Sequence, residues 1–239
     1  MTKPLDIIVP VFNEEACVEE FYARIAGLGL AEALIFVDNA STDRTVELLG
    51  RCPGIRLIRH ARNEGYGASI RDGIAASNAD RLIIIDADLE YPPEAIPDLL
   101  AALERHAVVY TSRFLGERPP DMPRFRRAGN RVISGVFNWL FHQRTSDFYT
   151  GMKGLRREAL AGLALTQNGF EHVIELGVQL AHSGYTIAEL PVTYTPRARG
   201  VSKMRHIPET LKYIWYIAVY WLRFSVLRRP LRPPLSNLL

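Results

Sequence analysis

Three acidic side chains follow an apolar run in the segment LIIIDADLEYPP, residues 82–93. The run itself is typical of a buried strand, and Asp86, Asp88 and Glu90 come directly after it at a spacing of two. Side chains at positions i and i+2 of an extended segment point to the same side. Carboxylates that converge in this way suit Mg²⁺ or Mn²⁺, hard cations that often complete their coordination shell with substrate phosphates.

A simpler interpretation is open for one of these residues. An aspartate shortly before the Pro92–Pro93 pair could cap the helix that follows. Such a cap would account for Asp88 alone. It would explain neither Asp86 nor the polar residues at the ends of the other expected strands.

The elements that must position these residues alternate along the first half of the chain. Helices are expected from the spacing of Val18, Phe21 and Ile25, from near residue 41, over 67–77 and after Pro93. Strands that look buried on both faces are expected at residues 5–9, 34–37, 55–58, 81–85 and 107–110. This alternation predicts an α/β fold with a parallel sheet and right-handed crossovers.

Ligands of open parallel sheets bind outside the carboxyl ends of the strands. Four consecutive expected strands deliver polar residues to that edge, and Arg113 follows the fifth. The polar segments are residues 10–14, 38–43, 59–69 and 86–88. We therefore expect the ligand site at this edge.

The second half has a different pattern. Residues 126–142 predict an amphipathic helix with Val132, Val136, Trp139 and Leu140 on one side. Further elements are expected as helices near 156–164 and 171–183, a strand near 186–195, a basic loop at 196–204 and a last helix at 207–227.

Composition narrows the class of protein. The 239 residues suffice for one large α/β domain, and two cysteines favour reduced thiols in the cytosol over a disulfide framework. The N-terminus shows no signal-peptide pattern, and the apolar run at 213–222 is shorter than the roughly 20 residues of a transmembrane helix. Without a G-x-G-x-x-G after the first strand or a P-loop motif, a dinucleotide oxidoreductase and a P-loop NTPase are disfavoured.

Charge is unevenly distributed along the chain. From Arg197 onward there are nine Lys or Arg residues and one acid, so the tail carries +8 and the rest carries −5. This asymmetry predicts a negatively charged partner: nucleic acid, anionic lipid or a substrate phosphate. No nucleic-acid-binding motif accompanies the charges, so we expect no nucleic-acid partner.

Seven segments together resemble a family 2 glycosyltransferase of the GT-A fold, and are similar to the dolichyl- or polyprenyl-phosphate sugar transferases. They are VPVFNEE, VDNASTDRT, RNEGYGAS, DADLEYPPE, SRF, DFYTGMKGLRREAL and RARGVSK, in the family's order and spacing. The resemblance implies a Rossmann-like, mostly parallel sheet with flanking helices. It implies a GT-A domain at 1–205, with a nucleotide-sugar half (1–112) and an acceptor half (113–205), and a basic, aromatic amphipathic helix and tail at 206–239.

The resemblance also implies roles for single residues. Asp86 and Asp88 match the metal-binding DxD motif, with Glu90 beside them where many relatives carry Gln. The nucleoside is expected to contact Pro10, Phe12, Glu14 and Asp38, with a less direct contribution from Asp43. The catalytic set is expected to comprise Asp88, Arg113, Arg199 and Lys203, the last two in a basic loop that closes over phosphate.

One departure from the family pattern is Lys153. The family often shows Gly-Phe-Arg where this chain has Gly151-Met152-Lys153. The substitution replaces the planar fork of an arginine with a point charge.

The function implied is metal-dependent, inverting transfer of a mannose- or glucose-like sugar from a nucleoside-diphosphate sugar to a polyprenyl or dolichyl phosphate. Two other hypotheses stay open. A hydroxyl acceptor would require a carboxylate base, for which Asp147, Glu171 and Glu175 are candidates. Alternatively, the chain could be a catalytically silent, membrane-associated module that binds nucleotide sugars.

Aromatic and basic residues in the helix at 207–227 suit peripheral contact with the cytoplasmic membrane face. The alternative is that this helix packs on the sheet or on another subunit. The sequence leaves open the donor base, the sugar, the length of the lipid and the oligomeric state.

Overall fold

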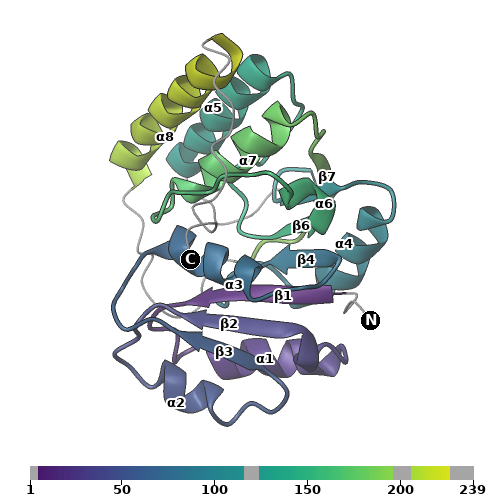
Figure 1. Cartoon of the computed structure of the whole chain (residues 1–239), viewed down its shortest axis with the longest axis vertical. Helices are drawn as coiled ribbons and strands as arrows, with labels where there is room; N and C mark the ends of the chain where they lie inside the picture. Colours follow the sequence, from purple (N-terminus) through teal and green to yellow (C-terminus); the bar gives the residue numbers. More distant parts are fainter. Residues whose placement is uncertain (1–4, 116–123, 196–205, 227–239) are drawn as a thin grey trace.

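The computed structural model describes residues 5–115, 124–195 and 206–226 (Figure 1). These residues contain one seven-stranded sheet in the order β3-β2-β1-β4-β6-β5-β7. All neighbouring strands are parallel except at β6, which is antiparallel to both β4 and β5. The strands are β1 (Leu5–Val11), β2 (Leu34–Asp38), β3 (Arg56–Arg59), β4 (Arg81–Ile84), β5 (Val108–Ser112), β6 (Lys153–Arg156) and β7 (Ala188–Pro191).

The five strands expected in the first half are present, with ends shifted by one or two residues. β2 and β5 are buried throughout, as their apolar runs predict. The expectation of burial on both faces is wrong for β3, which is only partly buried. β3 lies at the end of the sheet order and pairs with β2 alone, so solvent reaches its outer side.

The strand β6 was not expected from the sequence. Its four residues, Lys-Gly-Leu-Arg, contain no apolar run, and the nearest expected element was the helix near 156–164. Because β6 is antiparallel, it begins at the edge where the parallel strands end. Lys153, its first residue, lies opposite Ile84 of β4 and Tyr110 of β5. The segment before β6 therefore reaches the candidate site.

Helices flank both faces of the sheet. They are α1 (Val18–Gly27), η1 (Ala31–Ala33), α2 (Thr45–Leu49), α3 (Tyr66–Ala75), η2 (Pro93–Ala95), α4 (Ile96–Leu103), α5 (Arg124–Phe141), α6 (Arg157–Leu160), α7 (His172–His182) and α8 (His206–Trp221), which continues into the π-helical turn η3 (Leu222–Val226). α2 begins later than expected, and α6 is a single turn within the nine residues predicted. The strand expected at 186–195 is limited to β7.

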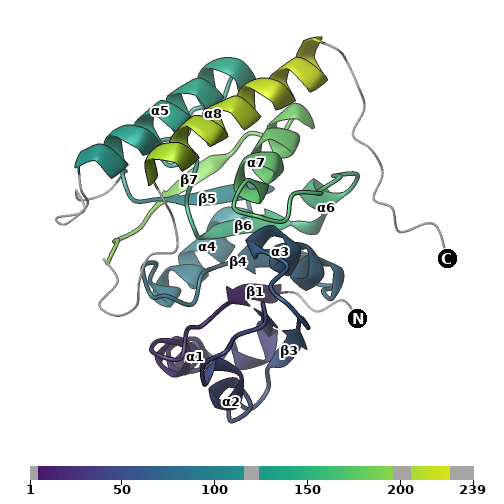
Figure 2. The same cartoon turned by 90° about the vertical axis from the view of Figure 1, so that its left-hand side faces the viewer.

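Two hydrophobic cores lie on opposite faces of the sheet. Consecutive strand residues point to opposite faces, so Ile7 belongs to the core shared with α1 and α4, and Ile8 belongs to the core that also contains residues of α3, α5, α7 and α8. Figures 1 and 2 show α5 and α8 side by side over the second face, and the two helices pack together.

The buried side of α5 differs from the expected one. Ile133, Phe137 and Phe141 enter the core, whereas Val132 is exposed and Trp139 is 77% exposed. Periodicity alone could not separate these two stripes, because apolar residues recur on both sides of the helix. The core stripe is therefore one that tertiary packing selected.

α8 is apolar on two sides, and each side has a different environment. Tyr213, Ile217 and Tyr220 are buried in the core. The exposed large residues of this helix and of η3 are Leu211, Trp215, Val219 and Leu222. α8 packs against α5 and α7 rather than directly on the sheet. Its aromatic residues thus contribute to the core on one side and are exposed on the other, so each of the two alternatives considered for this segment holds in part. None of the described helices combines the length and the apolar character needed to cross a membrane.

Candidate active site at the carboxyl edge of the sheet

The loops after β1 and β2 are joined by hydrogen bonds. The backbone N–H of Asn13 donates to Ser41 Oγ (2.9 Å), and the N–H of Thr42 donates to Asn13 Oδ1 (2.8 Å). The N–H of Glu14 donates to Thr45 Oγ1 (2.8 Å). These bonds hold the segment that contains Pro10, Phe12 and Glu14 against the loop that follows Asp38. The sheet therefore brings the expected nucleoside-contacting residues to one place.

Two aspartates of the second loop have different environments. Asp38 is buried at the end of β2, and its carboxylate accepts the N–H of Ser41 at 3.2 Å. Asp43 accepts the N–H groups of Thr45 (2.9 Å) and Glu15 (3.1 Å). Burial opposes ionisation of Asp43, but these hydrogen bonds and that of the Thr45 hydroxyl outweigh it and lower the pKa of the carboxyl. Asp43 thus stabilises the joined loops.

Backbone strain is concentrated at this edge. Asn13, Ala40 and Leu89 have φ values of 55°, 63° and 61°, in the left-handed region that non-glycine residues rarely adopt. One lies in the loop after each of β1, β2 and β4. Such conformations cost about 1–3 kcal/mol each and are concentrated at functional sites.

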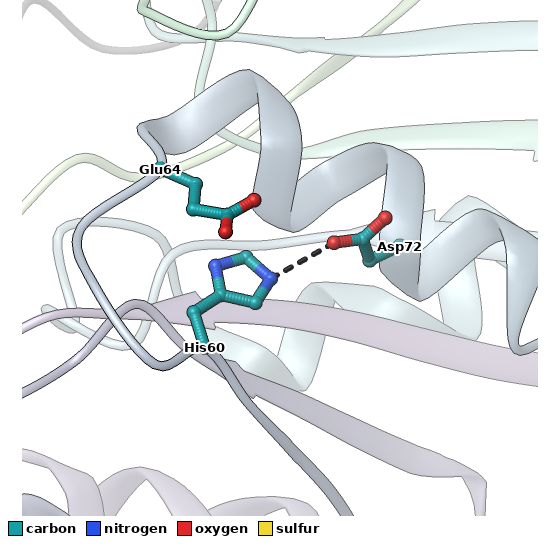
Figure 3. Close-up of side chains that lie close together, drawn as sticks. All are labelled: His60, Glu64 and Asp72. Atoms are coloured by element: carbon teal, nitrogen blue, oxygen red, sulfur yellow. Dashed lines mark hydrogen bonds and ion pairs between the residues drawn. The ribbon is translucent and has the colours of Figure 1, made fainter.

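A third loop is tied to this edge through His60, which follows β3 (Figure 3). Its Nδ1 lies 3.1 Å from Asn39 Oδ1 and its Nε2 lies 2.9 Å from Asp72 Oδ2 on α3. Among the described residues, His60, Glu64 and Asp72 are the one group of three metal-ligating side chains whose ligand atoms lie within 4.8 Å of one another. Both ring nitrogens are already hydrogen-bonded, so this group acts as a brace between β2 and α3.

Asp86 and Asp88 follow β4, at the middle of the sheet. Asp88 is buried, and its Oδ1 accepts the N–H of Glu90 at 3.0 Å. The helical segment that follows begins at Pro93 with Pro92 in the capping position and no side-chain cap. Asp88 therefore does not cap that helix, and the simpler interpretation of this residue is wrong.

The surroundings of Asp86 fit a metal ligand. A Cβ atom added to Gly151 would lie 2.8 Å from Asp86 Oδ2 and 2.8 Å from Tyr91 Cε2, so only glycine leaves this approach open. Asp86 and Asp88 are two carboxylates that could hold an Mg²⁺ or Mn²⁺ ion, which would take its other ligands from phosphates. In the described structure, Glu90 does not complete a compact group of three ligand atoms with them. Its role as a ligand stays a prediction.

Lys153 supplies a positive charge next to these carboxylates. The side chain is 2% exposed, donates to the Thr150 carbonyl and lies with Nζ 5.3 Å from the centre of the Tyr110 ring. Burial lowers the pKa of Lys153 to about 8 even though Asp86 and Asp147 attract its charge. The Gly-Met-Lys segment was recognised in the sequence as a departure from the family pattern. The antiparallel strand β6, which begins at Lys153 and places it here, was not predicted.

Arg113 is fixed by a bidentate ion pair. Its Nε and Nη2 donate to the two carboxylate oxygens of Asp147 at 2.6 and 2.8 Å. The guanidinium carbon also lies 5.6 Å from the ring centres of both Tyr91 and Tyr194. The expected contact of Arg113 with phosphate stays a prediction, since this cation is buried and already paired.

Arg199 and Lys203, the other expected phosphate-binding cations, lie outside the described residues. The chain just before them is tied to the carboxylate segment, because the N–H of Thr195 donates to the carbonyl of Glu90 at 3.2 Å.

The three acids considered as general bases all have hydrogen-bond or ion-pair partners. Glu175 is buried and accepts the N–H groups of Thr166 (2.8 Å) and Gln167 (2.9 Å) and the hydroxyl of Tyr220 (3.1 Å). Asp147 holds Arg113, as described above, and Glu171 forms an ion pair of 3.2 Å with Lys212.

Comparison with known proteins agrees with this arrangement. The family model described as "Glycosyl transferase family 2" matches residues 6–163. A dolichol-phosphate mannosyltransferase of Pyrococcus furiosus is 30% identical over 223 residues, which cover 88% of this chain and 62% of that protein. A dolichyl-phosphate hexose transferase of Haloferax volcanii is 30% identical over 201 residues, which cover 84% of this chain and 86% of that protein. The chain thus spans less than two thirds of the Pyrococcus protein.

Solved structures confirm the expected fold. Glucosyl-3-phosphoglycerate synthase from Mycobacterium tuberculosis, in complex with Mn²⁺, uridine-diphosphate and phosphoglyceric acid, superimposes with a TM-score of 0.69. The match covers 92% of this chain and 78% of that one, at 21% sequence identity. At this level of identity the similarity shows the α/β GT-A architecture.

Proposed function

The chain belongs to glycosyl transferase family 2, and on that premise we propose that it transfers a sugar from a nucleoside-diphosphate sugar to a polyprenyl or dolichyl phosphate. The sugar is a hexose of the mannose or glucose type, and the anomeric configuration inverts. The names of the relatives from Pyrococcus and Haloferax support a lipid-phosphate acceptor.

The observation that carries this proposal is that the acidic side chains of the acceptor half already have ion-pair or hydrogen-bond partners. A hydroxyl acceptor needs a general base within reach of its proton. Asp147, Glu171 and Glu175 are each held by a cation or by backbone N–H groups. A phosphate monoester has its second pKa at about 6 and is mostly ionised at pH 7, so it attacks without a base. The site therefore favours a phosphate acceptor over a sugar hydroxyl.

On the donor side, Asp86 and Asp88 would hold Mg²⁺ or Mn²⁺, with Glu90 beside them. The bound cation would neutralise charge on the diphosphate as the leaving group departs. Phe12, Glu14 and Asp38, together with Pro10, would border the nucleoside. Lys153 adds a fixed positive charge in a site of low dielectric, where such charges act strongly.

Arg113, Arg199 and Lys203 would screen the phosphates of donor and acceptor. Arg113 would do so from its fixed position between Asp147 and two aromatic rings. The other two belong to the basic segment that continues from Thr195.

We further propose peripheral contact with the cytoplasmic membrane face through the neighbouring helices α5 and α8. Trp139 and Trp215, 77% and 68% exposed, belong to their outward sides. Tryptophan is enriched where lipid headgroups meet the hydrocarbon region, and the basic tail suits anionic lipid. The double variant Trp139→Ala/Trp215→Ala should sediment less with anionic vesicles while it retains nucleotide binding. Unchanged sedimentation would contradict the proposed membrane contact.

The test of the activity has two steps. A thermal-shift panel with GDP, UDP, dTDP and CMP, each with and without Mn²⁺, identifies the donor base, because a ligand that binds only the folded state raises the melting temperature. Asp88→Ala is the control that should lose the metal-dependent shift.

The matching nucleotide sugar is then incubated with a short polyprenyl phosphate. A lipid-linked sugar is the expected product. Transfer to a saccharide alone would favour the hydroxyl-acceptor alternative, and nucleotide binding without any turnover would favour the silent binding module.

A further inference from the structure

His60 fixes the chain next to Asp38, the buried aspartate that is expected to contact the nucleoside. The backbone N–H of His60 donates to the Asp38 carbonyl at 2.9 Å. Its ring lies 3.1 Å from Oδ1 of Asn39, the next residue along the chain, and also reaches Asp72 on α3 (Figure 3). A single histidine thus joins the loop after β2, its own loop after β3 and the helix α3.

The orientation of the Asn39 amide identifies the donor in its contact with His60. Asn39 Oδ1 accepts the backbone N–H of Glu64 at 2.8 Å. Asn39 Nδ2 donates at 3.0 Å to Asn63 Oδ1, an atom that also accepts the backbone N–H of Gly65 at 3.1 Å. A backbone N–H can only donate, so neither amide can be turned round without losing these bonds. Asn39 therefore presents an acceptor to His60, and Nδ1 of the ring must carry a proton.

The second ring nitrogen of His60 faces another acceptor. Nε2 lies 2.9 Å from Asp72 Oδ2, a normal length for an N–H···O bond. An ionised carboxylate can only accept hydrogen bonds, and the Asp72 side chain is 49% exposed, so water is available to solvate its charge. Nε2 therefore carries a proton as well. With both nitrogens acting as donors, the ring has no lone pair left for a metal ion.

A ring with a proton on each nitrogen is an imidazolium, the charged form of histidine. The charged groups placed around it are Asp72 from α3 and Glu64 from the segment before α3, whose carboxylate is also directed toward the ring in Figure 3. Arg62 forms an ion pair of 4.0 Å with Glu64, and the Asp38 carboxylate of β2 is bonded within its own loop. These surroundings suit a positive charge on the ring.

Loss of one ring proton would break the brace at one end. A neutral imidazole has one N–H and one lone pair, and the lone pair would face either Asn39 Oδ1 or the Asp72 carboxylate. Both are acceptors, so one of the two hydrogen bonds would be lost. The His60 side chain is 6% exposed, and water cannot readily replace the missing partner. The loop after β2 would then be held less firmly against α3.

We propose that His60, with both ring nitrogens protonated, is a positioning residue for the donor site that holds Asp38 and the loop after β2 in the conformation that binds the nucleoside. Donor affinity should therefore be highest at low pH and should fall as the pH rises and the ring loses a proton. The inference rests on the nucleoside site of the proposed function and is independent of the acceptor.

The test measures the Kd of the matching nucleoside-diphosphate sugar by titration calorimetry, with the full-length chain and Mg²⁺, from pH 6 to pH 8.5. A sugar nucleotide is used because neither of its phosphates has a second proton to lose near pH 6, as a phosphate monoester does. The wild-type Kd should rise about fivefold over this range, the lower end of the coupling between linked sites. In ¹H–¹⁵N NMR spectra of the histidine rings, the loss of one proton from His60 should coincide with the loss of affinity.

Asp72→Asn separates a protonation-dependent brace from a merely structural one. The new amide can accept from a protonated Nε2 or donate to an unprotonated one, so the brace forms without the second ring proton. This variant should bind the donor with the wild-type affinity of pH 6 across the whole range. Asp98→Asn, at an exposed position on α4, is the matched control and should retain the wild-type pH dependence. Thermal unfolding at each pH shows whether the fold is intact.

The outcomes separate this inference from the proposed function. An unchanged pH dependence in Asp72→Asn would assign the effect to another group, such as Lys153, and would overturn the positioning role. A single ring proton on His60 at pH 6, or a wild-type Kd that is constant up to pH 8.5, would also overturn it and leave sugar transfer standing.

Two further outcomes concern the proposed function itself. Absence of donor binding at every pH would reject the nucleotide-sugar donor and this inference with it. Donor binding with the expected pH dependence, in a protein that makes no lipid-linked sugar, would keep the positioning role of His60 and reject only the proposed acceptor.

Discussion

The carboxylates of the two halves of this molecule differ in their partners. In the donor half, Asp38 and Asp88 lie at strand ends, where each accepts a backbone N–H two or three residues further along the chain. In the acceptor half, Asp147 and Glu175 are paired with groups 34 and 8 to 45 residues away. Asp38 and Asp88 are thus bonded within their own loops, whereas Asp147 and Glu175 hold distant parts of the fold together.

The difference indicates how the proposed reaction can proceed when only the donor half supplies carboxylates to the reaction. A carboxylate bonded within its own loop, such as Asp38 or Asp88, does not hold distant segments of the chain together. Carboxylates that accept an arginine fork or several N–H groups have their lone pairs occupied, because each oxygen offers about two. A phosphate acceptor is already negatively charged and needs no general base, so it suits an acceptor half whose carboxylates are occupied by other partners.

The largest effect on sugar transfer is expected from a substitution in the donor half. Asp88→Asn retains an oxygen for the Glu90 N–H but removes the negative charge that we propose faces the cation. Sugar transfer should fall about a thousandfold, equivalent to about 4 kcal/mol of transition-state stabilisation. The measurement is the initial rate of lipid-linked sugar formation with saturating Mn²⁺.

Asp98→Asn, an exposed position on α4, is the matched control and should transfer at the wild-type rate. Near-normal activity of Asp88→Asn would remove Asp88 from the catalytic set.

The second prediction concerns stability in the acceptor half. Asp147→Asn leaves the buried guanidinium of Arg113 without a counter-charge. Breaking a buried pair from one side should lower the free energy of unfolding by about 3 kcal/mol, measured by urea denaturation. The control Glu47→Gln breaks an exposed ion pair with Arg51 and should cost less than about 1 kcal/mol. An undiminished stability combined with abolished transfer would instead identify Asp147 as a base.

Glu175→Gln should have a smaller effect. The amide keeps one acceptor oxygen for the backbone of Thr166 and Gln167 but loses the charge that strengthens these hydrogen bonds. We expect a loss of about 2 kcal/mol in unfolding free energy, with transfer per folded molecule near the wild-type value. A large drop in kcat at unchanged stability would show that the comparison of the two halves is wrong.

The smallest effect is a pH dependence that arises from His172 on α7. Burial, with the nearby charges of Arg71 and Lys153, lowers the pKa of His172 to about 3, although Glu175 Oε2 lies 3.9 Å from its Nδ1. The unfolded chain binds a proton near pH 6.5 that the folded chain excludes. This residue should therefore lower the free energy of unfolding by up to about 1.4 kcal/mol as the pH falls from 6.5 to 5.5.

Urea midpoints of the wild type and His172→Met at pH 7.5, 6.5 and 5.5 test this prediction. The variant should show a shallower decline in stability than the wild type. Equal slopes would mean that other groups cause the acid sensitivity.

Much of the donor half could be predicted from local patterns. The apolar runs identified β1, β2, β4 and β5, and the polar residues directly after them identified Asp38, Asp86 and Asp88. This works because a parallel sheet collects strand ends at one edge, whatever the details of packing. The resemblance added the expected roles of Pro10, Phe12 and Glu14, which the structure places beside Asp38.

The acceptor half could not be predicted in the same way. β6 has no apolar run, and its antiparallel direction depends on the neighbours β4 and β5. The pairing of Arg113 with Asp147 joins residues 34 positions apart, and the contact of Gly67 with Gln167 joins residues a hundred positions apart. No local pattern carries such information.

By itself, then, the sequence determined the strands β1, β2, β4 and β5, the sheet edge at which they end and the acids placed there, because these follow from short-range patterns. The tertiary structure alone decided which acids hold distant segments together, which side of α5 enters the core and how closely Gly65 and Gly67 approach Asn168 and Gln167. The physical reason is that lone pairs, buried surface and glycine contacts are set by partners distant in the chain.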